Sequence, residues 1–145
     1  MITWFAQTDD GQGWKVCADG VIIEDSGRKK EIVRSIQSGL HIDDRPFGFS
    51  RCDDAIWGYL ISDIKNNDGR YQVAGFRADR NDIRSGADAV LQCLAPLAIK
   101  ISPTRKCEFT RALNCHSRKR RGVLAFFAIA VLSILAFCVR KLFKS

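Results

Sequence analysis

Two short clusters contain residue types that could do chemistry. His41 is followed by Asp43 and Asp44, so an imidazole and two carboxylates occur within four residues. Such groups could begin a metal site or act as acid and base in an enzyme. A metal needs three or four converging ligands, however, and neighbouring aspartate side chains point in different directions. The turn residues Asp43-Asp44-Arg45-Pro46 therefore favour a solvated loop.

The second cluster, Cys107 with Cys115-His116, resembles fragments of a zinc site. Its spacing is not C-x₂-C, and no second cysteine pair follows at a suitable distance. We expect free thiols, no metal and no cofactor, with S-palmitoylation of a cysteine near a membrane as an alternative. The chain has only two histidines, and His116 lies in the expected linker. A nucleophile–histidine pair would therefore have to use His41, and no nucleophile turn supports such a pair.

Aromatic residues suggest binding more strongly than these clusters suggest catalysis. Three tryptophans occur in a small domain, and a partly exposed aromatic side chain is a natural anchor for a partner. The candidate partner-binding residues are Trp4, Trp14, Phe47 and Phe49, the last two flanking Gly48 in an expected loop. A place in the core is the alternative for each of them.

An uncharged apolar segment, residues 122–139, predicts where the domain works. As a helix it would reach roughly 27 Å, about the hydrocarbon thickness of a bilayer. A core helix rarely runs so far without a charge, and an interfacial helix would need a polar face. We therefore expect a single transmembrane helix. Its singled-out residues are Gly122, Ala125, Phe126, Phe127, Ile129, Ser133 and Ala136, of which the small ones and Ile129 form a stripe that could pair two helices.

The positive charge of the chain belongs to this segment's flanks. Seven of the 23 Lys and Arg residues follow residue 117, where no Asp or Glu occurs, so the charges of residues 1–117 cancel and the excess of +7 is confined to the flanks. These residues are Arg118, Lys119, Arg120, Arg121, Arg140, Lys141 and Lys144. Basic flanks bind anionic lipid headgroups, so the high pI predicts a membrane partner and does not favour nucleic acid. The heavier N-terminal flank and the lack of a signal peptide predict that the domain in front is cytoplasmic.

The elements that must position these residues follow from periodicity. We expect strands within residues 2–25, joined by an Asp19-Gly20 turn, and an amphipathic helix over residues 28–38. Residues 41–50 should form a loop, followed by a helix capped by Asp53 or Asp54. A strand over residues 71–76, a helix from Asn81-Asp82 to Pro96 and a strand over residues 97–101 complete the domain.

This order predicts an α+β fold, a small and mostly antiparallel sheet with about three helices packed on one face. The expected organisation is a cytosolic domain at 1–101, a basic juxtamembrane linker at 102–121, a transmembrane helix at 122–139 and a short basic tail at 140–145. Our leading interpretation is a single-pass, C-terminally anchored binding or adaptor domain that acts through a protein or ligand partner.

Two other functions remain open from the sequence. One is a membrane effector, whose cytosolic domain senses a signal and whose spans self-associate and disrupt the bilayer. The other is a membrane-tethered enzyme that uses His41, Asp43 and Asp44.

Overall fold

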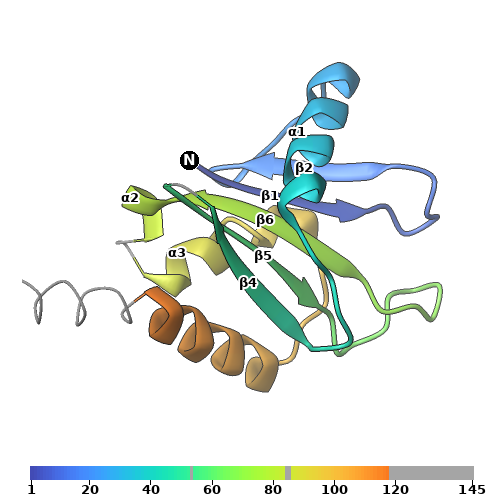
Figure 1. Cartoon of the computed structure of the whole chain (residues 1–145). Helices are drawn as coiled ribbons and strands as arrows, with labels where there is room; N and C mark the ends of the chain where they lie inside the picture. The colour runs from blue at the N-terminus through green and yellow to red at the C-terminus, as the bar shows by residue number, and fades with distance from the viewer. Residues whose placement is uncertain (53, 84–85, 118–145) are drawn as a thin grey trace, which may run out of the picture. The chain divides into compact units, whose positions relative to one another are not determined.

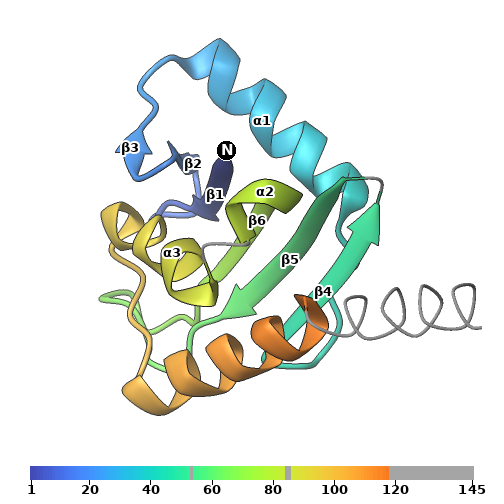
Figure 2. The ribbon, with the colours of Figure 1, turned by 90° about the vertical axis from the view of Figure 1, so that its left-hand side faces the viewer.

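A six-stranded antiparallel sheet forms the centre of the fold, with helices against both of its faces (Figures 1 and 2). The computed structural model describes residues 1–52, 54–83 and 86–117. The strand order is β3-β2-β1-β6-β5-β4, and every neighbouring pair is antiparallel. Figure 2 shows α1 on one face and α3, with the helix that begins at residue 103, on the other. The predicted α+β class is confirmed, but helices cover both faces rather than one.

The N-terminal strands form as the sequence predicts: β1 (Ile2–Gln7), β2 (Trp14–Ala18) and β3 (Val21–Ile22). Asp19 and Gly20 make the turn between β2 and β3 with φ of 47° and 81°. A type I′ hairpin turn has positive φ at both of its central residues. This turn type is favoured between paired strands because its twist matches theirs. The Asp19 carboxylate also accepts a hydrogen bond of 2.6 Å from the Ile2 N–H, which fixes the start of β1 beside the turn.

The amphipathic helix α1 (Ser26–Gly39) is also confirmed. The Asp25 side chain caps it by accepting a hydrogen bond of 2.6 Å from the Arg28 N–H. Val33 and Ile36 are buried against the sheet, while most of the charged side chains of the helix are exposed. The helix is therefore held by one apolar stripe, as its sequence spacing indicates.

The prediction for the next segment was correct only at its start. Residues 41–46 form the expected loop, but the rest of that loop and the Asp53- or Asp54-capped helix are replaced by two paired strands, β4 (Phe47–Cys52) and β5 (Ala55–Ile61). β5 lies between β4 and β6 and has helices over both faces, so it buries both parities of its sequence. A strand buried on both faces loses the alternation that distinguishes it from a buried helix.

The chain after β5 follows the prediction in part. β6 (Val73–Asp79) confirms the expected strand, and the expected long helix is divided into α2 (Arg80–Ile83) and α3 (Ala87–Gln92). Gly86, with φ of 98°, cannot continue a helix at that point. The carboxylates of Asp79, at the end of β6, and Asp82, in α2, both accept hydrogen bonds from the Met1 amino group.

The strand expected over residues 97–101 is absent from the structure. A 3₁₀ helix, η1 (Ala95–Leu97), takes its first position, and residues 98–101 run without a strand partner. Leu97 and Ile101 are buried in the layer that also contains α3. The alternation of apolar residues here reflects packing on the face of the sheet, where Leu97 and Ile101 are buried.

The segment expected to begin a linker at residue 102 is helical over residues 103–117. The Ser102 hydroxyl caps it by accepting a hydrogen bond of 3.1 Å from the Arg105 N–H. Asp63 in turn accepts the Ser102 N–H at 2.9 Å and the Ser102 hydroxyl. Phe109 and Leu113 are fully buried, and the compact unit of the fold extends from Met1 to Leu113. The folded unit therefore runs beyond residue 101, because two apolar side chains one helical turn apart pack on the sheet.

The predicted transmembrane helix and its flanks lie outside the described residues. This applies to the helix at 122–139, the tail at 140–145 and all the span and flank residues named above. Within the described residues, no helix is long and apolar enough to cross a bilayer.

The sheet separates two apolar layers. Successive strand residues point to opposite faces, so Trp4 lies in the layer with Phe76 and Phe109, while its neighbour Phe5 lies in the layer under α1. The layer under α1 is the smaller one. It remains open at one end, and this opening is the site considered next.

Candidate functional site

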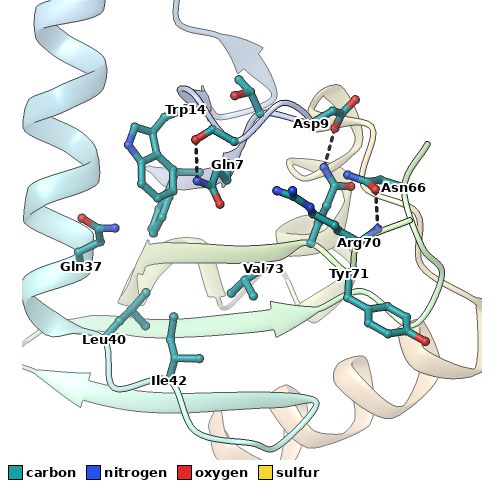
Figure 3. Close-up of a pocket in the computed structure, with 14 residues that line it drawn as sticks. Gln7, Asp9, Trp14, Gln37, Leu40, Ile42, Asn66, Arg70, Tyr71 and Val73 are labelled. Carbon is teal, nitrogen blue, oxygen red and sulfur yellow. Dashed lines mark hydrogen bonds between the residues drawn. The ribbon is translucent and has the colours of Figure 1, made fainter. Parts of the chain in front are cut away.

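A groove with a volume of about 210 Å³ opens on the α1 side of the sheet. Its walls come from the end of α1, from the β1–β2 loop (residues 8–13) and from the β5–β6 loop (residues 62–72) (Figure 3). β1 and β6 are antiparallel neighbours, so the end of β1 and the start of β6 lie at the same end of the sheet. That pairing brings two loops together that are about sixty residues apart in sequence.

The floor of the groove is apolar. It contains Phe5, Trp14, Leu40 and Val73, and the Phe5 and Trp14 rings meet edge to face with their centroids 5.3 Å apart. Gly75 of β6 pairs directly with Phe5 across the sheet. A β-carbon at Gly75 would lie 2.7 Å from Phe5 Cζ and 2.7 Å from Leu40 Cδ1. The missing side chain at Gly75 therefore lets Phe5 and Leu40 form a continuous surface.

The β1–β2 loop is held by its own hydrogen bonds. The Thr8 N–H donates to the Gly13 carbonyl at 2.9 Å, and the Gly13 N–H donates to the Thr8 hydroxyl at 2.9 Å. The Asp10 carboxylate accepts from the Thr8 hydroxyl at 2.5 Å and from the Gln12 N–H at 3.0 Å, and these bonds lower the pKa of Asp10. This wall of the groove is accordingly formed without a ligand.

The β5–β6 loop is fixed in the same way and is tied to the first loop. The Asn66 side-chain oxygen accepts the backbone N–H of Asp68 at 3.1 Å and that of Arg70 at 2.9 Å. Gln72 is largely buried and donates from its amide to the Asp9 carboxylate at 2.8 Å (Figure 3). This hydrogen bond joins the two loops.

Arg70 brings a positive charge to the groove. Its guanidinium points across the groove toward Gln7 (Figure 3). Arg70 Nη1 lies 3.8 Å, and Gln7 Nε2 3.6 Å, from the position of a β-carbon on Gly11. Asp9 is occupied by Gln72 and by Lys15, whose Nζ lies 3.7 Å away. Within the described part of the chain, the Arg70 guanidinium makes neither an ion pair nor a hydrogen bond, so it remains available to an anion.

The four aromatic candidates from the sequence fall into different places. Trp4 is fully buried, and its indole N–H donates to the Val90 carbonyl at 2.7 Å, so it is a core residue and not a surface anchor. Phe47 and Phe49 are half-buried in β4, with ring centroids 5.9 Å and 5.3 Å from that of Phe109. Of the four candidates, Trp14 alone lines the groove.

The His41 loop does not assemble an acid–base site. Asp43 accepts hydrogen bonds from the Tyr59 hydroxyl and from Arg45 Nε, the latter at 2.7 Å. The bond from Tyr59, followed by the bonds from Arg45, lowers the pKa of Asp43 to about 2. The His41 and Asp44 side chains are exposed. Over residues 1–52, 54–83 and 86–117, no group of three His, Cys, Asp or Glu side chains is placed to hold a metal.

Cys17, Cys93, Cys107 and Cys115 are free thiols. Cys17 is buried in the core, and burial raises its pKa to about 11. Cys107 and Cys115 are exposed on the helix of residues 103–117.

Sequence reasoning did not identify Gln7, Arg70 or Gln72 as site residues. The turns Asp10-Gly11 and Asn67-Asp68-Gly69, which lie within the groove walls, were visible in the sequence. Their meeting depends on the pairing of β1 with β6, which no local pattern reports. Comparisons of this chain with models of protein families, with curated proteins and with solved structures found no match.

Proposed function

We propose that this chain is a membrane-anchored binding module. Its folded domain recognises a ligand or partner in the groove, and residues 122–139 hold it at a membrane. The observation that carries the proposal is the groove itself, where an apolar floor lies beside the Arg70 guanidinium, which pairs with no group in the described residues. A few converging polar groups over an apolar surface are the usual composition of a ligand site.

The internal hydrogen bonds of the groove walls support a binding role. Both loops are closed by internal hydrogen bonds, and the contact between Gln72 and Asp9 joins them. A site that exists before the ligand arrives avoids the free-energy cost of ordering loops on binding. The groove thus suits recognition without a large conformational change.

The residue types in the groove favour binding over reaction. Amide and guanidinium groups form hydrogen bonds but do not change protonation state near neutral pH, so they are poor general acids and bases. Asp9, the carboxylate of the groove, already accepts from Gln72. The enzyme hypothesis relied on the His41 loop, and its Asp43 carboxylate is engaged by Tyr59 and Arg45.

The anchor is supported by the sequence. Eighteen residues without a charge, with basic residues on both sides, fit a single bilayer span. A tether raises the effective concentration of the domain near membrane partners without a new contact. This gives a small groove of modest affinity a useful occupancy.

The groove is tested by fragment screening with fluorine NMR on the full chain in lipid nanodiscs. Gln37 lines the groove and is exposed, so the larger side chain of Gln37→Trp should fill the groove. The control Ser35→Trp places the same side chain at an exposed position of α1 that does not line the groove. Fragments should bind the unmodified chain and Ser35→Trp, and should lose binding to Gln37→Trp. The groove hypothesis fails if no fragment binds or if Gln37→Trp leaves binding intact.

The anchor is tested by sedimentation. Full-length protein should pellet with membranes after lysis without detergent and should resist extraction by high salt, whereas a chain that ends at Ser117 should stay in the supernatant. Recovery of the full chain in the supernatant would contradict the anchor. If the full chain, and not the chain ending at Ser117, depolarised the membrane of expressing cells, the effector alternative would replace the binding module.

A further inference from the structure

The charge of the groove indicates the sign of its ligand. Arg70 contributes a guanidinium that nothing in the described part of the chain neutralises. The Gln7 amide lies beside it; one of its N–H groups donates to the Gly11 carbonyl at 2.9 Å, which leaves the other for a ligand. A guanidinium presents its N–H groups as a planar fork that fits the two oxygens of a carboxylate or phosphate. The groove therefore favours an anionic group at its Arg70 end.

The neighbouring carboxylate narrows the choice of anion. Asp9 lies on the β1–β2 loop, which the hydrogen bond from Gln72 joins to the loop that carries Arg70. The negative charge of Asp9 repels a dianion more than a monoanion. Lys15 Nζ lies 3.7 Å from the Asp9 carboxylate and is therefore engaged by it. One available guanidinium beside one carboxylate suits a singly charged carboxylate better than a doubly charged phosphate.

The floor and the volume describe the rest of the ligand. Phe5, Trp14, Leu40 and Val73 present an apolar surface. The volume of about 210 Å³ is below the roughly 300–1,000 Å³ of sites for drug-sized molecules. A ligand with an apolar body about as large as one amino-acid side chain fits this space, whereas a dinucleotide does not.

We infer that the groove binds a small free organic acid, with its apolar body on Phe5 and Leu40 and its carboxylate on the Arg70 guanidinium. This inference rests on the proposed binding function and names the ligand class for the same groove. Gln7 adds a hydrogen bond to the carboxylate, and Trp14 closes the apolar side.

The test measures binding of 3-phenylpropionate and its neutral amide, 3-phenylpropanamide, to the full chain in nanodiscs by calorimetry or ligand-observed NMR. The acid should bind about ten- to a hundredfold more tightly than the amide, as expected for a hydrogen bond to a charged group. Arg70→Gln should remove this preference and leave amide binding unchanged. Arg70→Lys should retain part of it, because the charge remains but the fork is lost. Arg28→Gln, an exposed change in the first turn of α1, at the opposite end of the helix from Gln37 and Leu40, should have no effect.

The outcomes separate the two proposals. Equal binding of acid and amide, both blocked by Gln37→Trp, would overturn the ligand class and leave the binding function standing. Tighter binding of phenylphosphonate than of the acid would also overturn it. A tripeptide with a free terminal Phe carboxylate that bound more than tenfold better than 3-phenylpropionate would reassign the site to a polypeptide terminus. If no probe and no screening fragment bound, the binding function itself would fail.

Discussion

Gly75→Ala should destabilise the fold because the sheet has no room for a β-carbon at that position. The added carbon would lie 2.7 Å from Phe5 Cζ and 2.7 Å from Leu40 Cδ1. Carbon atoms prefer a separation of about 3.5–4.0 Å, so both neighbours must shift by close to 1 Å. Phe5 is 4% exposed and packs against Trp14 and α1, which restricts its movement. Overpacking of this kind costs about 1–3 kcal/mol.

The assay is thermal unfolding of the full chain in nanodiscs, followed by tryptophan fluorescence. For a domain of about 110 residues each kcal/mol corresponds to about 4 °C, so Gly75→Ala should melt roughly 4–12 °C below the unmodified chain. Gly13→Ala is the matched control, since its β-carbon would meet Thr8 at an ordinary 3.7 Å.

A double-mutant cycle identifies the cause. Phe5→Leu removes the ring atoms that the new β-carbon would meet, so Gly75→Ala should cost less in that background. If Gly75→Ala melts together with Gly13→Ala, or costs the same with and without the Phe5 ring, the steric reasoning is refuted.

Two further perturbations test contacts away from the groove. The pKa of Asp43, about 2, lies below the value of about 3.9 for a free aspartate, so its contacts stabilise the fold above pH 4 and this contribution is lost as the pH falls toward 2. Tyr59→Phe should raise the pKa of Asp43, measured by NMR titration, and flatten the dependence of stability on pH between pH 4 and 2, measured by acid unfolding. Tyr71→Phe, which changes an exposed ring, is the control. An unchanged Asp43 pKa in Tyr59→Phe would contradict the assignment. Ser102→Ala removes the cap of the helix of residues 103–117 and should cost about 1 kcal/mol, with faster hydrogen exchange at the Arg105 amide. The exposed change Thr104→Ala should not accelerate that exchange, and equal exchange in both variants would show that Ser102 is not the cap.

Local patterns predicted the elements whose conformation depends on neighbouring residues. The Asp19-Gly20 turn needs two positive φ angles, which glycine and aspartate tolerate, and it formed where expected. The helix α1 exposes one face to solvent, so its apolar period is visible in the sequence.

The errors occurred where contacts distant in sequence decide the structure. Ile56, Trp57, Leu60 and Ile61 have a spacing that fits a helix, yet β5 is a strand because β4 and β6 pair with it on both sides. The helix from residue 103 does have a recognisable start, Ser102-Pro103, since serine caps helices and proline suits the first turn. In this helix only Phe109 and Leu113 are fully buried apolar side chains. The many charged residues around them hide the apolar period that would predict a helix.

The sequence by itself determined the α+β class, the first hairpin turn and α1, because each follows from the preferences of adjacent residues, and it predicts the uncharged span from length and charge alone. Only the tertiary structure decided the groove. Arg70, Gln7 and Leu40 belong to three separate segments, and the pairing of β1 with β6 and the packing of α1 on the sheet bring them together. No local pattern reports such a meeting, since its free energy comes from contacts between residues far apart in the chain.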